Sequence, residues 1–368
     1  MPTNTQQQVL RPENLTNAIN EIQTDIKINL PLGFFTESVR MVGDVGSYLK
    51  YTGSRKTAKL VNYGSPSLSR GKEGVKRRPV QLAHTFQNTD VNLIDSQGLM
   101  GPNGVVENIA VSEISRQLMD FKVQNVNLRK QAIASALVHF AVYFADDGDG
   151  YRLLPNSTGA DLTVDFDVPA GQKGQLDILG GGDIIDASWA TASTDILFHL
   201  SEVRRQMILL GGWEPKTILH GKNIPKYLRD NTALNQFFIR NPVFNNAVLS
   251  DDAPPGLSSY NWIDMSTGFI ENGAGTAEVI IGDDEIVFLP DFGNEWYNLY
   301  IGSYVKPVNL GNVSQDLMQA LTNFSQVFGM FAYATQNNDP SGLRMYAGDT
   351  FLPVINAPKA VCRADVTP

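Results

Sequence analysis

Basic side chains are concentrated in one short part of the chain. Residues 50–78 contain nine Lys and Arg residues and one acidic residue, Glu73. Of the 29 basic and 38 acidic residues in the whole chain, the remainder keeps 20 and 37, so its net charge is −17. Lys and Arg bind phosphates and carboxylates. The pattern therefore predicts an electrostatic contact in this region, and not a reaction.

This basic segment has three interpretations: a hairpin kept in solution by its charge, a nucleic-acid contact, or an arm that docks on an acidic neighbour. The second is disfavoured because only Tyr51 and Tyr63 are placed to stack on bases, and the acidic remainder would repel phosphate. We favour the arm, since copies of one chain supply both charges. The residues expected to contact another subunit are Arg55, Lys56, Lys59, Arg70, Lys72, Lys76, Arg77 and Arg78.

Residue types that carry catalysis or bind metals are not grouped in the sequence. The four histidines, which fall in four different expected elements, are His84, His139, His199 and His220. The acidic turns at 146–149 and 283–285 lack the ligand order of a calcium loop. One cysteine, Cys362, excludes an internal disulfide and a cysteine-based zinc site. We expect no enzymatic activity, catalytic residue, cofactor or metal.

The composition is that of a foldable chain with many turns. Its 368 residues include 42% hydrophobic and 18% charged residues, 32 Gly and 19 Pro. This length usually makes two domains or one large irregular domain. The first residues are polar and lack the apolar core of a secretory signal, and the uncharged segment 131–145 is too short to span a bilayer. We expect synthesis in the cytoplasm and no membrane contact.

One long helix must position the rest. Residues 105–145 contain neither Gly nor Pro, and an acidic Gly-rich turn follows. A helix over this range would be about 60 Å long, whereas a compact globule of this chain length is about 54 Å across. The comparison predicts a flat, elongated subunit. The apolar stripe drifts along the segment, which favours a helix lying across a sheet over a coiled coil.

Shorter patterns predict the other elements. Residues 57–64 and the segment after Val75 are expected to be the two strands of a basic hairpin, joined by the turn residues 65–74. Alternation at Val80, Leu82, His84 and Phe86 predicts a half-buried strand. Residues 150–168 predict a second hairpin. After a boundary near residue 186, a helix capped by Ser193–Asp195 is expected to end at Gly211–Gly212, and several strands end the chain.

These segments, in this order, resemble the major capsid proteins of tailed bacteriophages, whose fold is named for a Hong Kong phage, and in particular the lambda-like branch. Residues 52–86 resemble the extended loop of that family, and residues 111–144 resemble its spine helix. Residues 150–171, with V-D-F followed by P, resemble the next hairpin, and residues 187–221 resemble the opening of the axial domain. The resemblance implies an α+β Hong Kong phage-type major capsid fold, with an N-terminal arm, an extended β-hairpin loop, a long spine helix in a peripheral domain and an α/β axial domain.

The domain ranges follow from this resemblance. They are an N-terminal arm at 1–35, the start of the peripheral domain at 36–49, the extended loop at 50–79, the peripheral domain at 80–185 with the spine helix at 105–145, the axial domain at 186–338, and return strands of the peripheral domain at 339–368.

The resemblance also implies a function. The expected role is a major capsid protein that assembles into hexamers and pentamers, which form an icosahedral shell around viral double-stranded DNA. Expected partners are other copies, a separate scaffolding protein, a portal, a decoration protein and, weakly and without sequence specificity, the packaged DNA. The expected location is the virion, after assembly in the host cytoplasm. Alternatives are the shell of a cargo-loaded compartment with the same fold, another virion lattice protein such as a tail tube or sheath component, and a cytosolic α/β enzyme.

Overall fold

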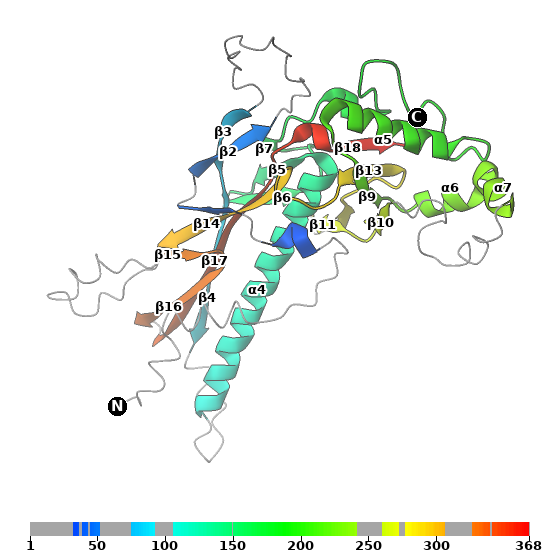
Figure 1. Cartoon of the computed structure of the whole chain (residues 1–368). Coiled ribbons are helices and arrows are strands. Elements are labelled where there is room, and N and C mark those ends of the chain that lie inside the picture. The colour runs from blue at the N-terminus through cyan, green and yellow to red at the C-terminus, as the bar shows by residue number, and fades with distance from the viewer. Residues whose placement is uncertain are drawn as a thin grey trace, which may run out of the picture.

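The structure is a computed structural model of the whole chain (Figure 1). It describes residues 32–36, 39–42, 45–51, 75–92, 106–148, 150–240, 260–271, 277–305, 326–338 and 341–367. Helices and strands are mixed along the chain, so the predicted α+β class is confirmed.

Two larger sheets form the centre of the molecule. The first has the order β1-β14-β17-β16, with β15 on β14 and β4 on β17. The second has the order β10-β9-β13-β18-β8. Their strands are β1 (Val39–Met41), β4 (Ala83–Asn92), β14 (Tyr297–Val305), β15 (Gln326–Phe328), β16 (Phe331–Asn338) and β17 (Ser341–Ile355) in the first sheet, and β8 (Lys173–Gly174), β9 (Pro215–His220), β10 (Asn261–Asp264), β13 (Glu285–Pro290) and β18 (Cys362–Asp365) in the second.

Three smaller sheets and the helices surround these two. The small sheets are β2 (Val45–Tyr51) with β3 (Val75–Gln81), β6 (Tyr151–Leu154) with β5 (Ala141–Asp146) and β7 (Leu162–Asp165), and β11 (Phe269–Glu271) with β12 (Ala277–Val279). The helices are α4 (Val106–His139), α5 (Ile196–Gly211), α6 (Ile224–Asp230) and α7 (Thr232–Arg240), with short 3-10 turns η1 (Leu32–Phe35), η2 (Ala170–Gln172) and η4 (Pro358–Ala360).

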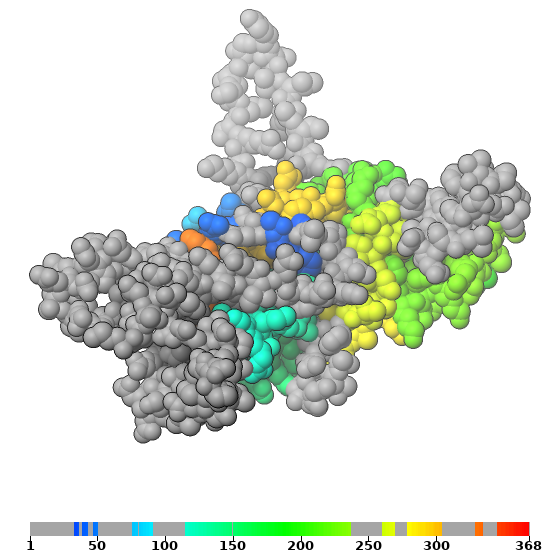
Figure 2. All heavy atoms as spheres, turned by 90° about the horizontal axis from the view of Figure 1, so that it is seen from below, coloured from blue at the N-terminus to red at the C-terminus, as the bar shows by residue number. Residues whose placement is uncertain are grey.

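Helix α4 lies across the first sheet, against β17 and β4, as the drifting stripe predicted. Its 34 residues span about 51 Å. Residues 132–138 are almost fully buried, whereas Met119, farther from the centre, is 49% exposed. Figure 1 shows α4 running well beyond the second sheet. Seen from below, α4 reaches the surface beside the second sheet, and α6 and α7 form one end of the molecule (Figure 2).

The predicted helix range 105–145 is wrong at its C-terminal end. Helix α4 stops at His139, and Phe140 has a positive φ of 58°, which breaks the helical path. Strand β5 follows at once and pairs with β6 and β7. The β-branched and aromatic residues of Ala141–Asp146 suit a strand, and pairing on both sides satisfies their backbone groups. The acidic Gly-rich turn therefore joins β5 to β6, and does not follow the helix.

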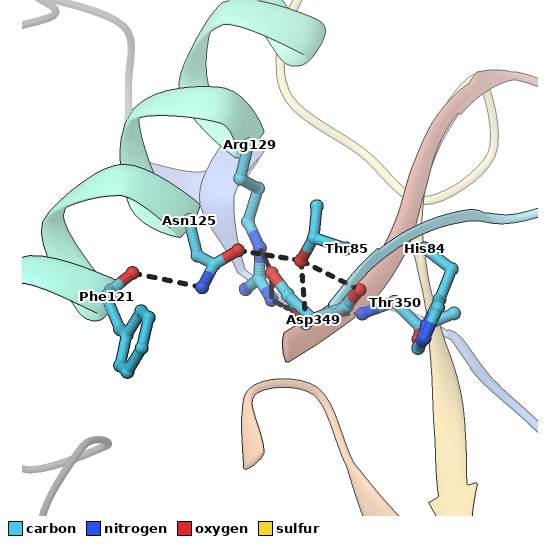
Figure 3. Close-up of polar contacts among 7 residues, drawn as sticks. All are labelled: His84, Thr85, Phe121, Asn125, Arg129, Asp349 and Thr350. Atoms are coloured by element: carbon cyan, nitrogen blue, oxygen red, sulfur yellow. Dashed lines mark hydrogen bonds and ion pairs between the residues drawn. The ribbon is translucent and has the colours of Figure 1, made fainter. Parts of the chain in front are cut away.

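A polar network joins α4 to β4 and β17 (Figure 3). Arg129 donates from Nε and Nη2 to the carboxylate of Asp349, with N–O distances of 2.6 to 3.0 Å. The Asp349 carboxylate is 0% exposed, and it also accepts the backbone N–H of Thr350 at 2.9 Å. A buried carboxylate needs a paired cation and hydrogen bonds to remain charged. The pair therefore sets where α4 lies on the sheet.

Thr85 of β4 extends this network. Its hydroxyl accepts the backbone N–H of Asp349 at 2.9 Å and donates to Oδ1 of Asn125 at 2.7 Å. Asn125 in turn donates to the carbonyl of Phe121, one turn earlier in α4. The helix and both strands are thus connected by satisfied hydrogen bonds.

The half-buried strand predicted after Pro79 is present as β4, but its burial differs from the pattern. His84 and Phe86 are on the exposed face, and Thr85 faces α4. The regular alternation is interrupted at Leu82, which separates β3 from β4 and is 3% exposed.

The N-terminal arm predicted for 1–35 must be shortened. Phe34 of η1 is 1% exposed and packs edge-on against Phe292, Trp296 and Tyr297. The hydroxyl of Tyr297 donates to the Phe34 carbonyl at 3.0 Å. These contacts place Phe34 in the core. The rest of the predicted arm lies outside the described residues.

The predicted domain ranges do not follow the sheets. β14 and β16, assigned to 186–338, belong to the first sheet with β4 and β17. β18, assigned to the returning strands at 339–368, instead pairs with β13 and β8 in the second sheet. The chain crosses between the sheets several times because strand pairing joins segments far apart in sequence. The names peripheral and axial stay predictions.

The caps of α5 are confirmed. Asp195 accepts the backbone N–H of Phe198 at the N-terminus, and Gly212 adopts a left-handed conformation with φ 82° after the last turn. Strand β9 and helix α6 follow this helix along the chain.

We predict that Asp349→Ala lowers the free energy of unfolding by about 3 kcal/mol, because it leaves Arg129 without its buried partner. Denaturant unfolding followed by circular dichroism measures the change. The control is Arg344→Ala, which breaks the exposed Arg344–Asp90 pair between β17 and β4 and should change the free energy of unfolding little. Equal losses in the two variants would contradict the assigned role of Asp349.

Candidate assembly interface

The structure describes three of the eight residues predicted to contact another subunit. Lys76, Arg77 and Arg78 lie on β3 and are exposed. The other five, Arg55, Lys56, Lys59, Arg70 and Lys72, lie outside the described residues, as do the predicted strand at 57–64 and the turn at 65–74. The intersubunit contact stays a prediction for all eight.

Strands β2 and β3 form the base of the basic hairpin. They pair antiparallel from Val45 opposite Gln81 to Tyr51 opposite Val75. Within the described ranges, neither strand pairs with any other strand. An isolated two-stranded ribbon is marginally stable in water at best. Further contacts must therefore hold this ribbon in place.

One carboxylate fastens the ribbon to the rest of the chain. Asp167 follows β7, and its Oδ2 atom is 2.8 Å from Nζ of Lys50 and also pairs with Arg78. Tyr48, which is opposite Arg78 in the ribbon, is 4% exposed. Arg78 therefore has a partner within its own chain, a contact that the sequence did not predict. Lys76 and Arg77 form no ion pair with any described residue.

Asp167 has an unusual backbone. Its φ is 55°, in the left-handed region that non-glycine residues seldom adopt, and its N–H donates to the Asp165 carboxylate at 2.8 Å. No local pattern in the sequence predicts this conformation. Asp is among the few side chains that tolerate it, and here it places a carboxylate beneath two cations of the ribbon.

The surroundings of Asp167 shift its pKa. Partial burial raises the pKa, but the hydrogen bond and charge of Lys50 and the charge of Arg78 outweigh it, so the pKa lies below its usual value of 3.8. The ionised carboxylate therefore stabilises the ribbon above about pH 4, and this contribution is lost as the pH falls through the lowered pKa. The other charged or titratable groups near this site are Tyr48 and Asp165.

The histidines are in separate structural settings. Burial, together with the charge of Arg363, lowers the pKa of His139 to about 4. The partners of the other three are the Thr350 hydroxyl for His84 at 2.7 Å, the Trp189 indole and the Asp186 carboxylate for His199 at 3.1 and 3.2 Å, and the Gly221 carbonyl for His220 at 3.0 Å. Within the described part of the chain, no three His, Cys, Asp or Glu side chains are grouped to hold a metal ion.

No helix among the described residues combines the length and the apolar character that crossing a membrane requires.

Comparisons with known proteins give structural likenesses only. No family model and no curated protein matches the chain. A phage-related protein from Bordetella bronchiseptica RB50 is similar with a TM-score of 0.48 and 11% identity, over 96% of both chains. A proposed capsid protein of a prophage of E. coli CFT073 has a TM-score of 0.46 and 9% identity, over 80% of both chains. The SrpI encapsulin of Synechococcus elongatus PCC 7942 has a TM-score of 0.39 and 10% identity, over 95% of this chain and 92% of the other.

These TM-scores are below 0.5, so the function proposed below depends on the geometry and charge of this chain.

We predict that Asp167→Asn loosens the ribbon without changing its backbone, because Asn tolerates positive φ but cannot pair with Lys50 and Arg78. At pH 7 the amides of β2 and β3 should exchange hydrogen several-fold faster than in the wild type, as measured by mass spectrometry. Below the lowered pKa of Asp167 the wild type should approach the variant, after correction for intrinsic exchange rates.

The control is Asp90→Asn, which removes an exposed ion pair of β4 and should leave exchange in the ribbon unchanged. Unaltered exchange in Asp167→Asn at pH 7 would show that the ion pairs of Asp167 with Lys50 and Arg78 do not hold the ribbon.

Proposed function

We propose that the chain is a major shell subunit, which assembles into hexamers and pentamers of an icosahedral shell around double-stranded DNA. The observation that carries the proposal is the ribbon of β2 and β3, which pairs with no other described strand. It is held to its own chain by the ion pairs of Asp167 with Lys50 and Arg78, which we call the Asp167 clamp. A ribbon of this kind gains stability from burial against a neighbour.

The exposed face of the ribbon supports this proposal. Leu49 is 42% exposed and lies opposite Arg77, so apolar and basic surface are adjacent. Exposed apolar surface next to charge is typical of a protein contact. The Asp167 clamp occupies Lys50 and Arg78. Of the described basic residues of the ribbon, Lys76 and Arg77 therefore stay available to an acidic partner.

The charge distribution supports another copy as the partner. Residues 50–78 are strongly basic, and the rest of the chain carries a net charge of −17. Because every copy has both parts, each arm meets an acidic surface on its neighbour, and a head-to-tail contact of this type closes into rings. Each contact needs only modest strength, since a closed assembly multiplies it.

The shape of the subunit is consistent with a thin shell. Helix α4 is about 51 Å long and lies along one face of the first sheet, while α6 and α7 are at the far end of the second (Figures 1 and 2). An elongated subunit covers more shell area per residue than a compact one. The acidic body also limits adhesion to packaged DNA, which lets the genome move during filling and release.

The partners and location expected from the sequence belong to this proposal. They are a separate scaffolding protein, a portal, a decoration protein, and weak non-specific contact with DNA inside a virion assembled in the host cytoplasm. The proposed role is structural and includes no enzymatic step.

We predict that deletion of residues 54–76 leaves a folded monomer that forms no closed shells, because the docking arm is missing. The wild type, expressed alone or with a candidate scaffold, should form shells visible by negative-stain electron microscopy. Circular dichroism and size-exclusion chromatography establish that the deletion variant is folded and monomeric.

A second variant separates charge from length. Substitution of Arg55, Lys56, Lys59, Arg70 and Lys72 by Gln keeps the full segment and should also reduce assembly, more strongly at low salt. Normal shells from the deletion variant would rule out the docking arm. A wild type that stays a compact monomer under all conditions, or particles filled with an enzyme cargo, would contradict the proposed function.

A further inference from the structure

A glycine-rich loop at residues 176–184, which we call the glycine loop, is anchored in the core that also contains α5. Two backbone hydrogen bonds close its base, from the N–H of Ile184 to the Leu176 carbonyl at 3.0 Å and from the N–H of Ile185 to the Gln175 carbonyl at 3.1 Å. Leu176, Ile184 and Ile185 are at most 5% exposed and pack in the same core as α5. The base of the loop is therefore fixed to the folded body.

The tip of the glycine loop stands clear of the body. A side chain placed at Gly180, Gly181 or Gly182 would meet no atom of the described residues within 4 Å. Gly180 and Gly182 have φ values of 75° and 105°, which glycine adopts readily. The carboxylate of Asp177 accepts the N–H of Gly182 at 3.1 Å. The tip is thus a projection with a defined shape.

Two side chains flank the glycines at this tip. Leu179 is 46% exposed, although the preceding Ile178 is only 8% exposed. Asp183, after the third glycine, is exposed as well. A single exposed leucine is ordinary, but this one lies on a fixed projection beside a carboxylate. Such a projection fits a hollow that offers apolar and basic surface.

Helix α5 provides such a hollow. A groove of about 350 Å³ lies along the helix, within the size range of small binding pockets in proteins. No residue of the glycine loop lines it, so loop and groove are separate surfaces of one chain. Its apolar surface comes from Leu197, Leu200 and Ile208, its basic surface from Arg204 and Arg205, and a further wall from Tyr260.

The charges at the groove complement those of the loop. Arg204 pairs with Glu214, Arg205 pairs with Glu202, and Lys216 lies 3.5 Å from Glu214. Three cations therefore meet two carboxylates. Such exposed ion pairs are weak, and a guanidinium has five N–H donors, so each arginine can also donate to a carboxylate of a partner. The ionisable residues of the glycine loop are both aspartates.

The shape of the groove favours this loop over other exposed apolar residues. Met119, Leu162 and Val279 are exposed and also lie beside acidic residues, but they are on a helix or on strands. A concave groove requires a convex partner. Among the described residues, the glycine loop combines an exposed large apolar side chain, a carboxylate and a projecting tip.

We propose that the glycine loop of one copy inserts into the groove on α5 of a neighbouring copy. Leu179 packs on the apolar surface of the groove, and Asp183 pairs with Arg204 and Arg205. Both surfaces are already formed in the single subunit, so the contact requires little ordering. A contact between two different surfaces of one chain generates a ring when the rotation closes. This inference rests on the proposed shell function, whose hexamers and pentamers are such rings.

Cysteine crosslinking tests the contact. Gly181 can be changed to Cys because its φ is not positive and a side chain there has open space. Ser201, which lines the groove, can be changed to Cys with almost no change in size, and the native Cys362 is fully buried. Two preparations with different tags, Gly181→Cys and Ser201→Cys, are mixed under assembly conditions and oxidised with glutathione disulfide. The expected result is a covalent dimer that carries both tags, at least about tenfold above the control pair.

The control pairs Ser201→Cys with Ser157→Cys, which is exposed in the turn between β6 and β7. Shells that form with no crosslinking above this control would overturn the inference and leave the proposed function intact. A wild type that never assembles would overturn both.

A second measurement does not depend on cysteines. Leu179→Ser should lower the yield of closed shells at least about tenfold, because a modest loss at each contact is multiplied around the ring. The matched control is Leu209→Ser, since Leu209 is 45% exposed on α5 but does not line the groove, and its yield should equal that of the wild type. Equal yields from these two variants, both folded by circular dichroism, would overturn the inference.

Discussion

The ion pair between Arg129 and Asp349 is the contact on which the described body depends. The carboxylate is fully buried, so it requires a cation, and only one position on α4 supplies it. A shift of the helix by one turn would bring Asn125 or Ile133 opposite Asp349, and neither can neutralise it. Residues 132–138 are buried on every side of the helix, and their apolar side chains carry no charge that distinguishes one register from the next. The ion pair therefore specifies the register of helix on sheet, while the apolar contacts supply most of the burial.

The position of α4 is passed on to the basic ribbon through a short series of contacts. The helix ends at His139, Phe140 turns the chain, and β5 begins at Ala141. β5 pairs with β7 from Ala141 opposite Asp165, and Asp167 follows two residues later. Asp167 then pairs with Lys50 and Arg78 of the ribbon. Among the described residues, two of the three non-glycine residues with positive φ, Phe140 and Asp167, begin and end this series.

Local signals predicted the elements that local chemistry decides. The Asp195 cap and Gly212 define α5 in a single segment, and the absence of Gly and Pro predicted most of α4. The end of α4 was missed because apolar aromatic residues suit both helix and strand, and pairing with β6 and β7 decides between them. The alternation around Phe86 predicted a strand but not that Thr85 would face α4, which depends on a residue more than 260 positions away. The role of Asp167 was missed for the same reason: its partners, Lys50 and Arg78, are distant from it in sequence.

The chain passes from one sheet to the other several times, and one of these passages connects β17 to α5 and β18. β17 carries Asp349 in the first sheet and ends at Ile355, and η4 then packs against α5 before β18 enters the second sheet. Cys362 and Ala364 of β18 lie in the same core as Leu200 and Val203 of α5. The segment from β17 through η4 to β18 therefore connects the sheet that carries Asp349 to the core beneath α5. Strands that continue through the centre of the molecule hold its two sheets together more firmly than a flexible linker between two domains would.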